Sequence, residues 1–184
     1  MKIRICCTLA VLSAFCAGAA PAKGADQPSR QDLFYYGDAR VLDLSSGRTE
    51  TQKILLEKIV DPQAGLLTEI ACFQEPGKPP RISPVYMKVD GSSVTISDAA
   101  DGKSGRLTGT GLLHGSGWNW NFLEFTMSIF GVRVEDVNFV VKDKLIARKR
   151  IFLASGAPVQ LWETEMTATT PEAYQERYKK LGCK

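Results

Sequence analysis

The chain has 184 residues and a net charge of +3, and two of its positive charges, Lys2 and Arg4, stand at the very start. The rest of the chain is nearly neutral, which gives no electrostatic reason to expect nucleic-acid binding. One histidine and five cysteines, three of which fall among the first 16 residues, provide no cluster of zinc ligands, and the sequence has no glycine-rich phosphate loop. We accordingly predict no metal and no cofactor.

The first 19 residues have the three-part pattern of a secretory signal peptide. Lys2 and Arg4 form a positive start, the uncharged run Ile5–Ala17 follows, and small residues favour cleavage after residue 19 or residue 22. A run of about 13 residues is shorter than the ~20 residues that cross a bilayer as a helix. The alternatives are an uncleaved anchor and a lipoprotein modified at Cys16, although Phe15 stands where lipoprotein processing requires a small residue.

Export would deliver a periplasmic or secreted protein with no transmembrane segment after cleavage. Residues 20–30 are rich in Ala, Pro, Lys and Gly, so we expect a flexible N-terminus there. Residues 31–184 are expected to form a single barrel-like domain, since about 165 residues suffice for one hydrophobic core.

Short apolar or alternating runs separated by turn residues extend from residue 33 to residue 168, which is the pattern of an all-β domain. The runs cover residues 33–44, 49–60, 66–74, 85–89, 93–97, 106–114, 117–129, 132–141, 145–153 and 159–168. Within the second run, residues 54–59 could also be helical, but the neighbouring threonines and the close turn favour a strand. The proline-rich segment 75–80 is expected to be a loop.

Two later runs carry features that predict distortions of a sheet. Gly109 and Gly111 share one face of their strand, which indicates sharp bending or the close approach of a neighbour. Trp118, Trp120 and Phe122 alternate on one face, but the apolar residues that follow have the opposite phase. We therefore expect either a bulge near Phe122 or a strand that is covered on both faces.

The C-terminal segment has the signals of a short amphipathic helix over residues 171–181. Thr170 can cap its start, Pro171 suits the first helical position, and Gly182 can end it. An apolar stripe at helical spacing predicts that the helix packs on the β-structure. The stripe consists of Tyr174, Tyr178 and Leu181.

Two cysteines, Cys72 and Cys183, remain after removal of the signal peptide. In an exported domain such a pair predicts a disulfide, with two free thiols as the alternative. The bridge would close a loop of about 110 residues, for which the loop-entropy estimate is roughly 4–5 kcal/mol. It would also attach the C-terminal helix to the third strand.

These runs, arranged in sequential hairpins and followed by a helix, predict an all-β antiparallel meander. We expect an up-and-down barrel or a strongly curved sheet with a short C-terminal α-helix, and the alternative is a β-sandwich.

This layout resembles the lipocalin-like (calycin) proteins, which are exported and combine a meander of strands, a C-terminal helix and a disulfide from the C-terminal region to an early strand. The resemblance covers most of residues 33–183. It implies a lipocalin-like barrel and the binding of an apolar small molecule. The Gly-x-Trp motif that these proteins carry in their first strand is absent from Leu33–Gly37, so the resemblance assigns no binding residues.

Candidate ligand-binding residues come from two groups. Trp118, Trp120, Phe122 and Trp162 are the best candidates for the lining of an apolar pocket, with ordinary core packing as the alternative. Arg148 and Arg150 share a face of their strand. If they point inward, they could hold the carboxylate or phosphate head of a lipid, and if they point outward, they form a solvated or weakly membrane-attracted surface.

Catalytic chemistry has little support in the sequence, and we predict no catalytic residue. A nucleophilic triad would have to use His114, but no Gly-x-Ser-x-Gly motif accompanies it, so we interpret it as a strand-end histidine with ordinary hydrogen bonds. Glu163 and Glu165 share a strand face, and the Glu135–Asp136 pair lies in another strand. Paired carboxylates can act as general acid and base, but a solvated strand face is the favoured interpretation.

The leading hypothesis from the sequence is a periplasmic or secreted carrier or binding protein for a lipid-like or other apolar small molecule. The second is a structural or protein-interaction module of the cell envelope that has no ligand. The third is a small isomerase or hydrolase built on carboxylates.

Overall fold

The computed structural model describes residues 29–101, 105–116, 119–129 and 131–183. The predicted signal peptide, most of the expected flexible segment and Trp118 therefore lie outside the described residues. No helix within the described ranges has the length and apolar character needed to cross a membrane.

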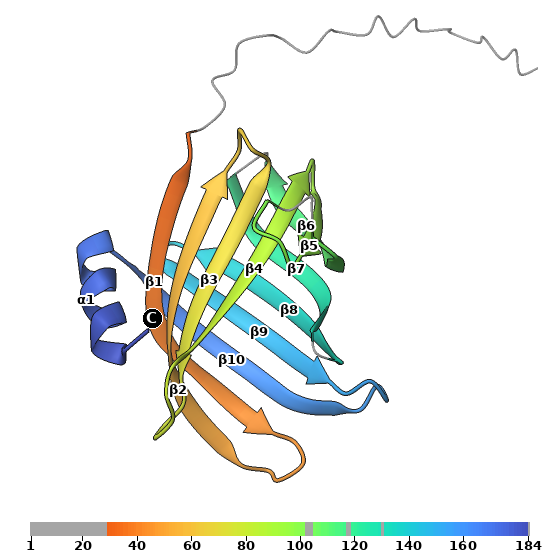
Figure 1. The fold of residues 1–184 in the computed structure, drawn as a ribbon, viewed down its shortest axis with the longest axis vertical. Coiled ribbons are helices and arrows are strands. Elements are labelled where there is room, and N and C mark those ends of the chain that lie inside the picture. Colours follow the sequence, from red (N-terminus) through yellow and green to blue (C-terminus); the bar gives the residue numbers. More distant parts are fainter. Residues whose placement is uncertain (1–28, 102–104, 117–118, 130, 184) are drawn as a thin grey trace, which may run out of the picture.

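The described residues form ten antiparallel strands that close into a barrel (Figure 1). Each strand pairs with the next along the chain, and the last pairs with the first. This confirms the predicted meander, in which each of the predicted runs corresponds to one of the strands, and excludes the β-sandwich. The strands are β1 (Gln31–Asp43), β2 (Thr49–Asp61), β3 (Leu66–Gln74), β4 (Arg81–Asp90), β5 (Ser93–Ser97), β6 (Leu107–Ser116), β7 (Asn119–Ile129), β8 (Val132–Val141), β9 (Lys144–Phe152) and β10 (Pro158–Thr169).

The segment that could have been helical is part of β2. Ile54 and Leu56 face the interior of the barrel, whereas Leu55 is buried on the outer side. Because both faces of β2 are covered here, the apolar residues run on without alternation, and the sequence pattern mimics that of a buried helix.

The inward glycines of β6 allow the barrel wall to close tightly. A Cβ atom at Gly111 would overlap the carbonyl oxygen of Glu124 on β7, and one at Gly109 would overlap that of Thr126. Gly37 on β1 is in the same situation against Glu165 of β10. The close approach expected at Gly109 and Gly111 is therefore confirmed.

A register shift interrupts the pairing of β6 with β7. It lies between His114 and Gly115 on β6, which face Phe122 and Trp120 on β7. This is the bulge expected near Phe122, and it explains why the apolar phase reverses at Leu123, which is fully buried inside the barrel.

Helix α1 (Pro171–Leu181) packs on the outside of the barrel beside β1 and β2, as Figure 1 shows. The hydroxyl oxygen of Thr170 accepts a hydrogen bond from the backbone N–H of Ala173, and Gly182 ends the helix in the left-handed conformation. Tyr174 is buried against the barrel wall. A disulfide joins Cys183, just after the helix, to Cys72 on β3, which confirms the predicted pairing.

Two apolar clusters occupy the barrel interior. One lies around Trp162 and Phe73 and consists of Tyr35, Ala39, Val41, Ile54, Leu56, Phe73, Leu145, Ala147, Trp162 and Met166. The other lies around Met87 and Phe125 and consists of Val60, Leu67, Met87, Val94, Ile96, Leu113, Leu123, Phe125, Met127 and Val134. Leu33 and Ile151 pack against both clusters.

Candidate functional site

Two ion pairs lie inside the barrel among these apolar side chains. The Lys58 ammonium is 2.8 Å from a carboxylate oxygen of Glu69, and the Lys149 ammonium is 3.1 Å from one of Asp136. Lys58, Glu69 and Asp136 are buried, whereas about a quarter of the Lys149 side chain remains exposed. Charges at such positions are retained only with a partner, because their desolvation is costly.

The pKa values of the neighbouring groups reflect this buried, charged interior. Burial raises the pKa of Asp136; the charge of Lys149 opposes the rise and that of Glu69 adds to it. Burial also raises the pKa of Tyr35, and the charge of Glu69 contributes. Asp136 and Tyr35 thus both respond to Glu69, which places the two ion pairs and the phenol in one electrostatic cluster.

Lys149 connects this cluster to aromatic rings near one end of the barrel. Its ammonium lies 5.9 Å from the centre of the Phe73 ring and 5.8 Å from that of the Trp162 ring. The two rings meet edge to face, with their centres 5.6 Å apart. A cation within about 6 Å of an aromatic face is attracted by the ring quadrupole.

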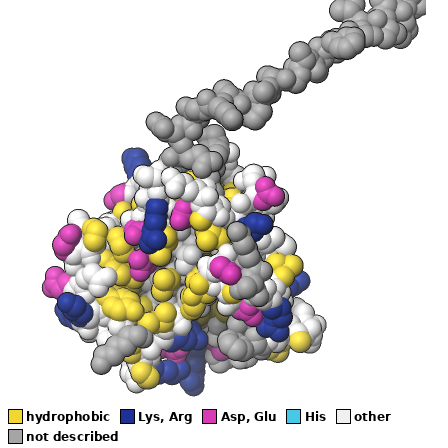
Figure 2. Space-filling view, turned by 45° about the horizontal axis from the view of Figure 1, so that its top comes forward, with side chains coloured by type: hydrophobic (Ala, Val, Ile, Leu, Met, Phe, Trp, Pro, Cys, Tyr) yellow, Lys and Arg dark blue, Asp and Glu magenta, His cyan; other side chains and the backbone are white. Residues whose placement is uncertain are grey.

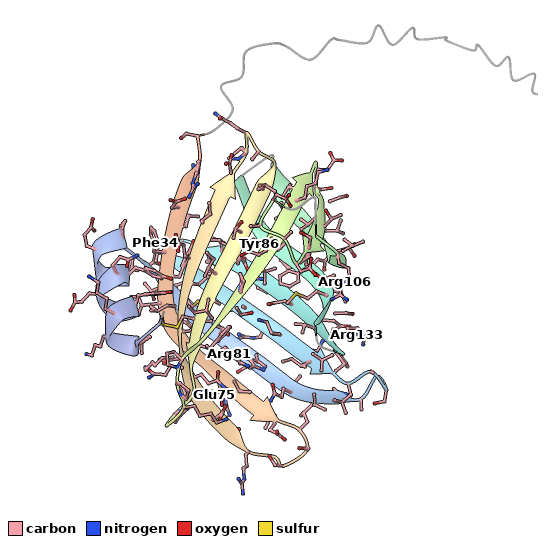
Figure 3. The ribbon with its side chains drawn as sticks, in the orientation of Figure 1. Phe34, Glu75, Arg81, Tyr86, Arg106 and Arg133 are labelled. Carbon is pink, nitrogen blue, oxygen red and sulfur yellow. A yellow bond between two sulfur atoms is a disulfide. The ribbon has the colours of Figure 1, made fainter. Side chains whose placement is uncertain are left out.

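A polar cavity of about 400 Å³, here called the mouth cavity, opens at this end of the barrel. It lies near the turn between β1 and β2 and the turn between β3 and β4, where Figure 3 labels Glu75 and Arg81. Trp162 reaches the cavity from the interior. The lining is Val41, Asp43, Ser46, Arg48, Glu50, Gln52, Glu75, Lys78, Arg81, Gln160 and Trp162.

A second cavity of about 380 Å³, here called the side cavity, lies in the barrel wall. It forms because β5 is short and pairs with β4 only from Tyr86 to Asp90, so the first half of β4 has no strand beside it on that side. Pro84 lies in this unpaired half, where a residue without an N–H is tolerated. The lining is Ile82, Ser83, Pro84, Val85, Tyr86, Ile96, Ser97, Asp98, Arg106, Thr108, Met127 and Ser128.

The side cavity reaches the apolar interior of the barrel. Ile96 and Met127 belong to the second apolar cluster, and Val85 packs against it. Figure 3 shows Tyr86 on β4 and Arg106 across from it. In the tilted view of Figure 2, hydrophobic side chains gather at the centre of the face and charged side chains surround them.

The predicted aromatic group is divided between the two sides of the barrel wall. Trp162 is buried inside, against Phe73. Phe122 belongs to the outer face, where its ring contacts His114 and Phe139 edge to face, in both cases with centres 4.9 Å apart. Trp120 lies on β7 opposite Gly115. Because the bulge changes which side of β7 faces inward, Phe122 and Trp162 do not share a lining.

The two predicted arginines point outward. Arg148 pairs with Glu163 at 3.5 Å and Arg150 with Glu135 at 2.7 Å, and more than half of each arginine side chain is exposed. They therefore form a solvated surface and do not enter the barrel. Glu165 lies on the same outer face and pairs with Lys144.

His114 and Glu135 lie on the outer surface of the barrel, whereas Asp136 is buried. His114 is exposed and lies 3.3 Å from Glu124, as expected of a strand-end histidine. Glu135 and Asp136 are adjacent in sequence, so the pleat sends Glu135 outward and Asp136 into the core.

Sequence reasoning missed the interior charges, although a signal for them exists. Three of them stand alone in runs of alternate residues that are otherwise apolar or small, such as Leu56, Lys58 and Val60 or Ala147, Lys149 and Ile151, whereas Asp136 is followed on the same face by Asn138. Because a strand sends alternate residues to one face, such a run identifies a charge that must share the buried side.

Comparison with known proteins gives a likeness in structure. No family model matches the chain, and no curated protein matches it in sequence. A solved structure of a protein of unknown function from the DUF3598 family of Nostoc punctiforme PCC 73102 is similar, with a TM-score of 0.55 and 14% identity. The likeness is one of fold. It covers 74% of this chain and 46% of that protein, so the chain spans about half the length of this neighbour.

Proposed function

We propose that this protein is an exported binding protein or carrier for a lipid-like or other apolar small molecule, and that the side cavity is its binding site. The side cavity carries this proposal, because it brings apolar core residues such as Val85 and Met127 to an opening in the barrel wall. Ligand sites are commonly concave and apolar with a few polar groups at their edges.

The rim of the side cavity suits a ligand with a polar or anionic end. The Arg106 side chain is 81% exposed, and its contact with Asp98 is long, at 3.8 Å. Arg106 therefore retains donors for a carboxylate or phosphate group. Ser83 and Thr108 add hydroxyl groups to the lining. The apolar part of the ligand would lie against Met127.

Other features agree with this proposal. The two apolar clusters and the ion pairs occupy the interior, which favours a site in the wall over a central chamber. The closed meander and external helix extend the likeness to lipocalin-like (calycin) proteins, which implies binding of an apolar molecule. The disulfide between Cys72 and Cys183 suits an oxidising compartment such as the periplasm.

The test is titration of the purified, disulfide-bonded protein with the apolar fluorophore N-phenyl-1-naphthylamine. We expect saturable uptake with enhanced fluorescence. Ser83→Trp should fill the side cavity and weaken uptake at least tenfold. Thr95→Trp adds the same ring to an exposed position of β5 and should leave uptake unchanged. Equal uptake by Ser83→Trp and the unchanged protein would exclude the site, and native mass spectrometry of protein from its own host compartment should show a co-purifying lipid.

The outer face of the barrel favours a second candidate function, that of an interaction module of the cell envelope. The Phe122 and Phe139 rings pack together on this face, and Leu112, Phe139 and Val141 are 43%, 37% and 53% exposed. Exposed apolar groups of this kind mark interaction surfaces. A photo-crosslinking residue at Phe139 should then form a discrete adduct in the host envelope, and one at Lys53 should not.

A further inference from the structure

The mouth cavity contains equal numbers of acidic and basic side chains, but most of the acidic ones are already engaged. The carboxylate of Asp43 accepts hydrogen bonds from Ser45 and Ser46, which hold its pKa at about 2. Glu75 pairs with Lys78 on its own turn. Among the described residues, Glu50 is the acidic member of the lining that has neither a cationic partner nor a hydrogen bond from a hydroxyl group, although the side-chain amide of Gln52 donates to it.

Glu50 stands beside a buried hydrogen-bond acceptor. The side-chain amide of Gln52 donates to Glu50 Oε1 at 2.6 Å, and Gln52 is only 2% exposed. Its Oε1 atom has no hydrogen-bond partner among the described residues. Turning the amide over would set this oxygen against the Glu50 carboxylate, so the contact with Glu50 fixes Oε1 as an unpaired acceptor. Native proteins keep few such atoms, and each calls for an explanation such as a ligand.

Arg81 provides the opposite charge from the other side of the mouth cavity. Its guanidinium lies 5.6 Å from the centre of the Phe73 ring. Its ionic contact is a distant one, 3.9 Å from a Glu75 oxygen, and Glu75 is engaged by Lys78. The planar donor fork of Arg81 therefore remains available for a carboxylate, which it can bind with two parallel hydrogen bonds.

The pairing register places the Gln52 acceptor and the Arg81 guanidinium on different strands that border the mouth cavity. Ile54 on β2 pairs with Phe73 on β3, which pairs with Arg81 on β4, and Gln52 lies two residues from Ile54 on the same inward face. Two strand spacings separate β2 from β4 by about 10 Å. A hydrogen-bond acceptor on β2 and an anion-binding guanidinium on β4 thus face the same cavity.

We propose that the mouth cavity is a second binding site, separate from the side cavity, for a small zwitterion that bears a carboxylate and an ammonium group. The carboxylate binds the Arg81 guanidinium. The ammonium donates hydrogen bonds to Gln52 Oε1 and to the Glu50 carboxylate. Trp162 forms the floor against which the carbon chain of the ligand lies.

The test uses three probes of the same length: 4-aminobutanoate, butanoate and butylammonium. They are added to the ¹⁵N-labelled, disulfide-bonded protein while the side-chain N–H signals of Gln52 and Trp162 are followed by NMR. We expect saturable shifts with 4-aminobutanoate, and at least tenfold weaker binding of each single-charge probe. Equal responses to all three probes, or no saturable shift with any of them, would overturn the proposal.

Two variants test the carboxylate-binding and ammonium-binding groups separately. Arg81→Gln should weaken the binding of 4-aminobutanoate and of butanoate about tenfold and leave the binding of butylammonium unchanged. Gln52→Met should weaken the binding of 4-aminobutanoate and of butylammonium and leave the binding of butanoate unchanged. Arg133→Gln, which removes a cation on the outside of β8, is the control and should bind all probes normally. An Arg81→Gln variant that binds 4-aminobutanoate normally contradicts the proposal, and its uptake of the apolar fluorophore reports on the side cavity independently.

Discussion

Lys58 has one of the most completely buried charged side chains in the described chain, at 1% exposure, and its ammonium faces Glu69. Removing one partner of a buried pair leaves the other charge uncompensated, which typically costs about 3–5 kcal/mol, whereas replacing both by apolar residues is often neutral. The pair therefore determines stability mainly through the penalty for breaking it.

We expect Lys58→Met to lower the free energy of unfolding by about 3–5 kcal/mol, and the double variant Lys58→Met, Glu69→Leu to recover most of that loss. Urea unfolding of the oxidised protein measures both. Lys53→Met makes the same substitution in an exposed pair with Asp38 and should cost less than about 1 kcal/mol. A double variant less stable than the single one would contradict this account.

Asp136 should make part of the stability dependent on pH. Burial raises its pKa above the ordinary value of 3.8, so the folded state binds more protons than the unfolded state between the two pKa values. The contribution of Asp136 to the free energy of unfolding is therefore fully present at pH values below 3.8 and is lost as the pH rises through its folded pKa. In Asp136→Asn this decline should vanish.

The unfolding free energies of the unchanged protein and of Asp136→Asn, measured from pH 3 upward, test the effect of Asp136. Their difference should change in this acidic range and level off at higher pH. A carboxyl titration by NMR that placed the pKa of Asp136 below 3.8 would contradict the prediction.

At the scale of single elements, the inward glycines decide whether neighbouring strands can approach each other. We expect Gly111→Ala to lower the free energy of unfolding by about 3 kcal/mol, because its methyl group would meet the backbone of β7 at Glu124 and not a side chain that can move away. Thr110→Ala, an outward position on the same strand, should change it by less than about 1 kcal/mol. Thermal unfolding of both variants measures these changes. Equal losses of stability in Gly111→Ala and Thr110→Ala would contradict the prediction.

Most of the elements could be predicted because their signals are local. Alternating apolar runs predicted the strands. The capping residue Thr170 and the terminal Gly182 predicted α1, and the reversal of apolar phase indicated the bulge near Phe122. The first half of β4 was missed, because the strand was predicted to begin only at residue 85, after the proline-rich loop at 75–80 and Pro84. Prolines argue against a paired strand, but this half of β4 is bonded on one side only, so Pro84 is tolerated. The missed segment is the one that creates the side cavity.

The candidate site was harder to predict because it depends on contacts between distant strands. Trp162 was a candidate for a pocket lining, with core packing as the alternative, and it is buried in the interior. Nothing local in the sequence shows that it lies beside Lys149 and Phe73. Arg81 and Gln52 face one cavity only because β2, β3 and β4 are neighbours in a particular register. A one-residue change in that register would turn either side chain to the other face.

For the whole molecule, the disulfide holds the C-terminal helix to the barrel across 111 residues of sequence. Cys72→Ser combined with Cys183→Ser should lower the free energy of unfolding by about 2–5 kcal/mol. Because α1 packs on the outside and contributes no strand, the barrel should persist while amide hydrogen exchange in α1 accelerates. Far-UV circular dichroism and exchange mass spectrometry measure these effects, and unchanged exchange in α1 would show that side-chain packing holds the helix without the disulfide.

The closure of the barrel by β1 and β10 determines when folding can be completed during synthesis of the chain. Phe34 pairs with Thr169, so the seam of the barrel joins two strands that are made at opposite ends of synthesis. Before β10 emerges from the ribosome, β1 and β9 are both unsealed edges, and pairing across such sequence separations is slow. The barrel therefore cannot close until the last strand of the chain has been synthesised, so closure is a late step of folding.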